Sequence, residues 1–501
     1  MTRLRSAFAL ALVAAPLSAA TVTRVVPIVL DVTTDTARYT TELTLTNDTP
    51  DAVTVSALYT PALGSKSGNG TVADNLGPGE QRRIPDVLAW LRTKGLSLPP
   101  VEVEWSQGGT LKLDFTGPNV EPARVWALAR TGSDTGPPLP VGRASTSYAA
   151  PLAGEGATSA FLYAVFSAVD RTNVALVNLS PEPLTYSVRI VDAAPIGRGY
   201  SVRPSSVLEG WGWTQINSDE LLAHGGMGFG LVFVSATAPV WSYAVVNDRV
   251  TNDGSFFPPN SLASVSSQLL KGYTVAVEVG QFSTEVELFG DGSPSPFSSP
   301  FVGLVFNDSI AGGEAGFSQL MFYSESYPDI IDNLRGVRGS TLGPRGTQSA
   351  GILEVDVSWG GGALVRTLAH SSSGGRFGVN VPPLQMSDAA LTRAAVYGLV
   401  ADNTNRSNVG VFSPEGPVTL LLELHDGLAG GAVRGSPLAV ALAAHEWRQV
   451  NDILRGAGVT EGWVEVTRTS GTAGWFAYGV VNDGAYPGER TGDGAYVPMS
   501  K

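Results

Sequence analysis

The sequence contains no cysteine and only four histidines, and only 15% of its 501 residues are charged. Without cysteine the chain has no disulfides, no thiolate metal sites, no thiol nucleophile and no lipid attached through an N-terminal cysteine. The Gly-x-Ser-x-Gly, Ser-x-x-Lys and Gly-x-x-x-x-Gly-Lys motifs are also missing. Their absence removes the usual sequence signs of a serine nucleophile and of a phosphate-binding loop.

The histidines form no catalytic or metal-binding motif. His224, His370, His425 and His445 are scattered along the chain. The segment that begins at His445 starts like a zinc-protease helix, but Gln449 stands where the second histidine ligand is needed. We therefore predict no catalytic residues, no cofactor and no enzymatic activity.

Long apolar runs are absent beyond the first residues, which resemble an export signal. Arg3 and Arg5 precede an apolar stretch from Ala7 to Ala15, and Ser18–Ala20 offers a small-residue cleavage site. We expect a signal peptide at 1–20 and export to the periplasm of a bacterium or to the medium. No later stretch approaches about 18 apolar residues, so the sequence predicts no transmembrane segment.

The overall composition is that of an acidic globular protein. The formal net charge is −13, which argues against nucleic acid and anionic membranes as partners. Hydrophobic residues make up 43% of the chain, enough for extensive burial. A chain of 501 residues is too long for a single core, so several domains are expected.

The chain repeats itself in an alternating order. The segment from Trp241 to Asp248 recurs as Trp475 to Asp483, and Tyr163–Glu182 recurs as Tyr397–Glu415 after almost the same interval. Two earlier segments recur after a second shared interval: Tyr39–Leu45 as Phe282–Leu288, and Ile84–Arg92 as Tyr327–Arg335. We therefore predict four units after the signal peptide, namely A (21–148), B (149–261), A′ (262–388) and B′ (389–501).

Each unit carries short alternating stretches separated by turn residues, as in Tyr39–Asn47 and Ala52–Tyr59. Alternation with a period of two indicates antiparallel strands. The predicted fold is all-β, with four tandem immunoglobulin-like β-sandwich domains in an A-B-A-B arrangement. Proline-rich joints at Pro137–Pro140, Pro258–Ser261 and Val381–Leu384 predict a semi-rigid rod.

Two kinds of acidic site deserve consideration. Glu102 and Glu104, and Glu354 and Asp356, lie on one face of their strands, which indicates a solvated face rather than the facing carboxyls of a glycosidase. The closing loops of B and B′ gather oxygen ligands that suit Ca²⁺, although such clusters are also common in turns. The calcium candidates are Asp248, Asp253, Asp483 and Asp493.

Tryptophan suggests either sugar stacking or packing. Trp241 and Trp475 recur at equivalent places, as do Trp213 and Trp447, which favours packing. Trp90 has no counterpart in A′ and is the candidate for an exposed aromatic surface.

The segments Trp447–Leu454, Gly462–Val466, Tyr478–Asp483 and Gly494–Pro498 resemble an uncharacterised family of tandem immunoglobulin-like repeats in bacterial secreted proteins. The resemblance is good in B and B′, partial in A, and weak at the start of A′, where Asp291–Phe297 departs from the pattern. It implies a sandwich fold and transfers no catalytic residue.

The sequence therefore predicts an exported, non-enzymatic binding, adhesion or scaffolding protein of the bacterial envelope or medium, with a protein or glycan as its partner. The alternative is an exported carbohydrate-binding protein or hydrolase with a site between domains. A deep polar cleft between domains would favour this alternative.

Overall fold

We describe the protein from a computed structural model. The described residues are 19–34, 37–63, 68–99, 106–192, 199–223, 228–259, 269–289, 301–321, 324–358, 362–370 and 375–501. Most of the predicted signal peptide, His224, the pair Glu102 and Glu104, and the Asp291–Phe297 segment lie outside them. Within the described ranges, no helix is long and apolar enough to cross a membrane.

Unit A is a sandwich of two four-stranded layers. One layer has the order β4-β3-β6-β1 and the other β5-β2-β7-β8, and the two are joined where β1 meets β2. Its elements are β1 (Ala20–Thr33), β2 (Arg38–Asn47), β3 (Val53–Leu63), β4 (Gly70–Leu76), β5 (Glu80–Ile84), α1 (Val87–Thr93), β6 (Ser106–Gly117), β7 (Val125–Thr135) and β8 (Gly142–Ala149).

Unit B repeats this arrangement with one long strand in place of two. The first half of β14 pairs with β9 and β11, and its second half pairs with β10 and β15, so β14 serves both layers. The elements of B are β9 (Ala157–Val165), β10 (Asp170–Asn178), β11 (Leu184–Asp192), β12 (Gly199–Leu208), β13 (Trp213–Ile216), α2 (Ser218–Leu222), β14 (Phe229–Asp248) and β15 (Gly254–Phe257).

Units A′ and B′ have the same pairings, in the layers β16-β21-β18-β19 and β20-β17-β22-β23, then β24-β29-β26-β27 and β28-β25-β30-β31. The elements of A′ are β16 (Leu270–Glu278), β17 (Phe282–Phe289), β18 (Phe301–Asp308), β19 (Glu314–Leu320), β20 (Glu325–Tyr327), α3 (Ile330–Arg335), β21 (Ser349–Val357), β22 (Gly362–His370) and β23 (Arg376–Val379). After the 3-10 turn η1 (Met386–Asp388), those of B′ are β24 (Arg393–Val400), β25 (Asn405–Ser413), β26 (Val418–Asp426), η2 (Gly427–Ala429), β27 (Ala432–Leu442), β28 (Glu446–Val450), η3 (Arg455–Ala457), β29 (Glu461–Gly471), β30 (Phe476–Asp483) and β31 (Gly494–Pro498).

An equivalent hydrogen bond occurs in each of the four units, which indicates a common fold. In each, a hydroxyl on the second strand accepts the backbone N–H of a residue near the end of the first strand, at 2.7 to 2.9 Å. The four hydroxyls belong to Thr41, Thr172, Thr284 and Ser407. The predicted all-β sandwich fold is confirmed, and units A and B resemble each other in their strand pairings.

The short helices α1 and α3 each begin directly after an aspartate. Asp86 caps α1 by accepting the N–H of Ala89, and Asp329 caps α3 by accepting the N–H of Asp332. An aspartate at this position satisfies a backbone donor that the first helical turn leaves without a partner. Gly95 follows α1 with a φ of 95°, a conformation that glycine adopts without steric cost.

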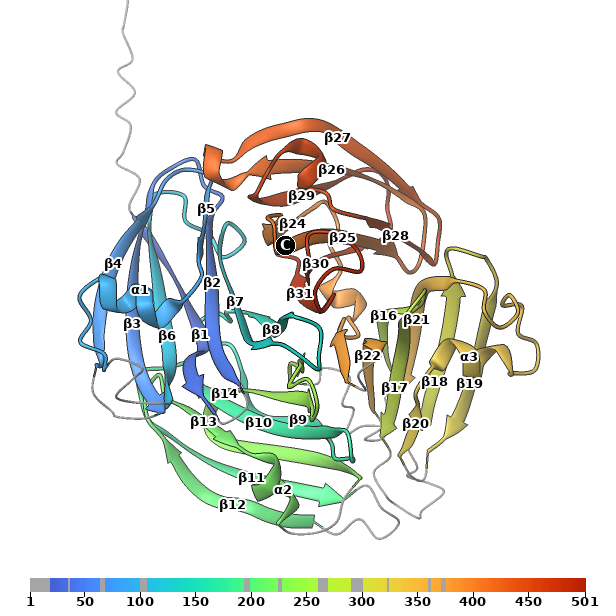
Figure 1. The fold of residues 1–501 in the computed structure, drawn as a ribbon, viewed down its shortest axis with the longest axis horizontal. Coiled ribbons are helices and arrows are strands. Elements are labelled where there is room, and N and C mark those ends of the chain that lie inside the picture. The colour runs from blue at the N-terminus through green and yellow to red at the C-terminus, as the bar shows by residue number, and fades with distance from the viewer. Residues whose placement is uncertain are drawn as a thin grey trace, which may run out of the picture.

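The four units close into a ring, and the predicted rod is wrong (Figure 1). Unit B′ returns to unit A, where the Tyr397 hydroxyl donates to Asp48 at 2.9 Å and the Gln81 side chain bonds the backbone of Gly398. The segment Pro137–Pro140, expected to join A to B, lies between β7 and β8 within unit A. The last strands β8, β15, β23 and β31 meet around the centre.

The ring forms because the inner layers of B and B′ are apolar on both faces. Val174 and Leu176 of β10 point into the core of B, whereas Ala175 and Val177 join the core cluster of unit A. Successive side chains of a strand point to opposite faces, so a continuous apolar run must be covered twice. A rod would leave the second face exposed to water, and each Å² of apolar surface left exposed would cost about 25 cal/mol of folding free energy.

Candidate functional site

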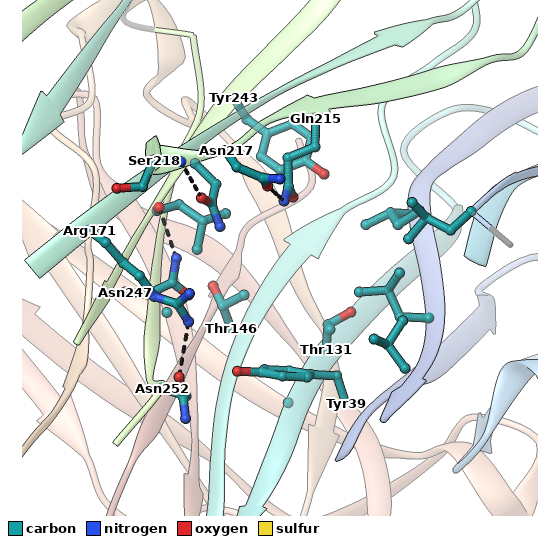
Figure 2. A pocket seen from close by; sticks show the side chains of 18 of the residues that line it. Tyr39, Thr131, Thr146, Arg171, Gln215, Asn217, Ser218, Tyr243, Asn247 and Asn252 are labelled. Atoms are coloured by element: carbon teal, nitrogen blue, oxygen red, sulfur yellow. Dashed lines mark hydrogen bonds between the residues drawn. The ribbon is translucent and has the colours of Figure 1, made fainter. Parts of the chain in front are cut away.

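A cleft with a volume of about 770 Å³ lies between units A and B (Figure 2). Unit A contributes residues of β1, β2, β3, β7 and β8 to its walls, and unit B contributes β10, β13, α2 and the end of β14. The cleft exists because β10 and β13 pack their apolar outer face on unit A through Val177 and Trp213, while their polar ends reach past that contact.

The B side of the cleft is a row of amide and guanidinium groups. The Arg171 Nη2 atom donates to Asn252 Oδ1 at 2.9 Å, and Gln215 Nε2 donates to Asn217 Oδ1 at 2.6 Å (Figure 2). The Asn247 amide donates to a backbone carbonyl at 3.1 Å. These bonds hold the side chains in place and leave further donors and acceptors on the same groups for a ligand.

Tyr39 crosses the cleft from the A side. Figure 2 shows its ring directed toward the side where Arg171 and Asn252 lie. Burial raises the pKa of the Tyr39 hydroxyl, although the charge and hydrogen bond of Arg171 act in the opposite direction. The hydroxyl therefore stays protonated near neutral pH and can both donate and accept.

Part of this polar row recurs in B′. Gln449 donates to Asn451 at 2.6 Å, as Gln215 does to Asn217, so this hydrogen bond is common to units B and B′. The arginines differ: in B′ the Arg406 guanidinium donates to the Gly484 and Tyr486 carbonyls of its own unit. The A′ counterpart of Tyr39 is Phe282. Arg171, Tyr39 and Asn252 therefore distinguish the cleft.

The described lining of the cleft holds few titratable groups. Among the residues that the structure describes, it contains the carboxylate of Asp219, the guanidinium groups of Arg171 and Arg249, and no histidine. Glycoside hydrolysis needs two facing carboxyls, and general acid–base catalysis needs a group suited to proton transfer. The lining instead joins neutral hydrogen-bonding groups to apolar and aromatic side chains, a combination that suits a neutral polar ligand.

The structure separates the four calcium candidates into two kinds. Asp248 Oδ1 accepts the backbone N–H groups of Val250 and Thr251, and its Oδ2 accepts Arg376 Nε at 3.1 Å. Asp483 likewise accepts two backbone N–H groups through Oδ2 and Arg490 through Oδ1. Asp248 therefore combines turn contacts with an arginine of A′, whereas Asp483 accepts the N–H of Arg143 in unit A and that of Thr491 in its own loop.

Asp253 and Asp493 act between units. Asp253 Oδ2 accepts the N–H of Gly378 in A′ at 2.8 Å, and Asp493 Oδ2 accepts the N–H of Ser145 in A at 2.7 Å. Among the described residues, no three His, Asp or Glu side chains gather in a way that could hold a metal ion. The two loops therefore serve as contacts between sandwiches.

The remaining carboxylate and histidine candidates lie outside the cleft. Glu354 and Asp356 both face Lys271 on β16. His425 stacks on Trp463 with ring centroids 5.2 Å apart, whereas His370 and His445 are exposed. Glu354 and Asp356 thus share one lysine, and neither is near the cleft lining.

The recurring tryptophans pack, as predicted. Trp213 donates to the Tyr243 hydroxyl and Trp447 to the Tyr478 hydroxyl, both at 3.0 Å. Trp475 is fully buried, and Trp241 is partly buried and stacks on Phe256. The Trp90 side chain packs partly buried against the core of A, so it is not a free aromatic platform.

Sequence reasoning missed Tyr39, Arg171, Asn217 and Asn252 as members of one site. Their spacing carries no recognisable motif, because the cleft exists only when A and B pack together. The available signal was the polar ends of otherwise apolar strands, as in Asp170–Asn178.

Comparison with known proteins does not identify the chain. No family model matches it, and no curated protein matches it. A search of solved structures found the crystal structure of Salmonella alpha-2-macroglobulin reacted with methylamine, with 12% sequence identity and a TM-score of 0.11. That match covers 97% of this chain, which spans about 31% of the length of that structure, and its similarity is too low to support a relationship.

Proposed function

We propose that the protein is an exported, non-enzymatic binding protein that holds a neutral polar ligand, a glycan segment, in the cleft between units A and B. The observation that carries this proposal is the cleft itself, about 770 Å³ in volume and walled by two sandwiches. Pockets of this size that combine apolar surface with a few fixed polar groups are typical ligand sites.

The chemistry of the lining favours a sugar over a charged ligand. Sugars present many hydroxyls, which pair with amides, hydroxyls and guanidinium groups such as those of Gln215, Asn247 and Arg171. The apolar residues Leu30 and Leu63 on the A side offer surface for the carbon faces of a sugar ring. Among the described lining residues, one Asp and two Arg leave little net charge for an ionic partner.

The test is a glycan-array screen of the mature chain, followed by titration calorimetry with the glycans that bind. Arg171→Ala is expected to weaken binding about tenfold or more, because a hydrogen bond to a charged group contributes about 1.5–3 kcal/mol. Tyr39→Phe is expected to weaken it by up to about tenfold, because a neutral hydrogen bond contributes about 0.5–1.5 kcal/mol. Tyr486→Phe is the matched control, since Tyr486 is exposed in B′. Binding that both cleft variants leave unchanged, or turnover of any glycan, would overturn the proposal.

A second candidate function is protein contact through the edge strand β27. All residues from Ala432 to Ala439 are exposed, and the strand pairs only with β26 among the described strands. Exposed edges can accept an added strand from a partner. Replacing the exposed Leu438 with Lys is expected to abolish such an interaction in a pull-down from envelope extracts, while leaving glycan binding unchanged.

A further inference from the structure

Two equivalent contacts hold opposite corners of the ring. In the loop after β14, Thr251 Oγ1 donates to the Arg376 carbonyl of A′ at 2.7 Å. In the loop after β30, Thr491 Oγ1 donates to the Arg143 carbonyl of A at 3.1 Å. Together with the bonds of Asp253 to Gly378 and of Asp493 to Ser145, these contacts form two matching clamps, which we call the B–A′ and B′–A clamps.

Each clamp contains a buried aspartate with one oxygen that has no partner. The exposed fraction is 4% for Asp253 and 1% for Asp493. Within the described part of the chain, Oδ1 of each has no hydrogen-bond partner, although Oδ2 of each is bonded. A buried carboxylate with an unsatisfied oxygen is costly in its charged form.

The two aspartates lie at the same place in the ring. Gly254, next to Asp253, lies against Thr146 of β8, where an added Cβ would be 3.7 Å from the Thr146 methyl. Gly494, next to Asp493, lies against Val379 of β23, where an added Cβ would be 3.4 Å away. The two loops thus insert between the same pair of strands, β8 and β23.

The surrounding charges do not neutralise this pair. Arg376 on β23 is engaged by Asp170, Asp248 and Glu285, and Arg490 is engaged by Asp483. On β8, Arg143 donates to the Thr40 carbonyl and pairs with Asp134 at 3.6 Å. Asp248 and Asp483, the nearest carboxylates on β14 and β30, add negative charge.

We propose that Asp253 and Asp493 together hold one proton at the centre of the ring, and that its loss loosens both clamps and the adjoining wall of the cleft. The part concerning the cleft rests on the function proposed above. Ser145, Thr146, Asn252 and Gly254 line the cleft and also adjoin the two aspartates in sequence or by contact. One proton on an Oδ1 atom removes one of two neighbouring charges.

The direction of the pH effect follows from the same burial. Burial, and then the charge of Asp493, raise the pKa of Asp253, and burial raises the pKa of Asp493 to about 7. The unfolded chain releases these protons near pH 4. The folded ring is therefore most stable in mild acid, and its stability falls as the pH rises toward about 7.

The experiment measures unfolding and ring closure of the mature chain without ligand between pH 5 and pH 8. In the wild type, the folding equilibrium constant is expected to fall by up to about tenfold per pH unit from this proton alone. Asp493→Asn, which supplies a neutral N–H donor, is expected to reduce this dependence and to keep the radius of gyration by X-ray scattering constant. Glu314→Gln, at an exposed residue, is the control and should behave as the wild type.

Two results would overturn the proposal. One is an identical pH dependence in wild type and Asp493→Asn. The other is a marked rise in melting temperature on adding CaCl₂ to the wild type at pH 8, because a cation would then replace the proton. Should the variant fail to fold, the infrared band of a protonated carboxyl in the wild type must disappear as the pH rises from 5 to 8. Since no ligand is used, a failure of glycan binding leaves these measurements unaffected.

Discussion

Replacing Arg366 with Met tests the ion-pair network that joins B to A′. The Arg366 side chain is 2% exposed, and its Nη1 atom lies 3.0 Å from Asp170 Oδ1 in B. Its Nη2 atom bonds Glu285 within A′. The exposed fractions of the two acidic side chains are only 5% and 9%, so the whole network is shielded from water.

The expected loss is about 3–5 kcal/mol, because removing one partner leaves buried carboxylates without their countercharge. Burial alone would raise the pKa of Asp170, but Arg366 and Arg376 outweigh it and hold the pKa below its ordinary value. The native pair therefore stabilises the fold above the unfolded pKa, and this contribution disappears as the pH falls through the folded pKa. In Arg366→Met, Asp170 loses part of its countercharge while its burial remains, so the variant takes up a proton more readily as the pH falls. The deficit of Arg366→Met should therefore be larger at pH 7 than at pH 4.

Differential scanning calorimetry at both pH values provides the measurement. Because 1 kcal/mol shifts the melting temperature by about 2–8 °C in domains of 60–250 residues, a loss of ~3–5 kcal/mol should lower it by at least ~6 °C. Arg345→Met is the matched control, since Arg345 pairs with Asp332 while 79% exposed and should change the stability by less than ~1 kcal/mol. Equal effects of the two substitutions would refute the reasoning.

A rescue sharpens this test. The A–B′ contact has an equivalent arginine with a neutral partner. Arg130 Nη1 donates to the Asn405 amide oxygen at 2.9 Å, whereas Arg366 Nη1 donates to the Asp170 carboxylate. Adding Asp170→Asn and Glu285→Gln to Arg366→Met should therefore recover a substantial part of the lost stability. A triple variant no more stable than the single variant would contradict a charge-based explanation.

Three further outcomes are expected. Gly142→Ala places a Cβ 2.2 Å from Asp483 Oδ2 and should open the B′–A contact. The radius of gyration should then rise, while the strand content by circular dichroism changes little. Gly136→Ala is the control, because an added Cβ there has nothing within 4 Å and should leave the radius of gyration unchanged. Trp447→Phe removes the buried indole N–H bond to Tyr478 and should cost about 1–3 kcal/mol in urea unfolding, and an unchanged midpoint would argue against this bond. Adding Ca²⁺ or a chelator near neutral pH should leave the melting temperature unchanged, whereas a rise of several degrees with Ca²⁺ would restore the calcium hypothesis.

The strands and the repeat could be predicted from the sequence because they depend on local patterns. The alternation in Tyr39–Asn47 corresponds to β2, which spans Arg38–Asn47. The Pro85-Asp86 pair marks the start of α1 through a cap that needs only one side chain and one backbone donor. Such features are decided within a few residues, so a single unit suffices to reveal them.

The ring and the cleft could not be predicted in the same way, because they depend on contacts between distant units. The bond from Gln81 to Gly398 and the facing positions of Tyr39 and Arg171 leave no trace in spacing. The sequence did indicate the second buried face. The run Val174–Val177 is apolar at every position, whereas a strand with one solvent-exposed face alternates apolar and polar residues. Proline-rich joints suggested a rod because linker composition was considered without this second buried face.

The duplication of the chain affects how readily the ring closes. Because the B–A′ and B′–A clamps use equivalent atoms, a chain of half this length carrying both faces would form the same ring as a two-fold symmetric homodimer. Its closure would depend on protein concentration. Joining the two halves in one chain replaces that association with an intramolecular step at a high effective concentration, about millimolar for a short flexible linker. Dilution would then leave the ring closed.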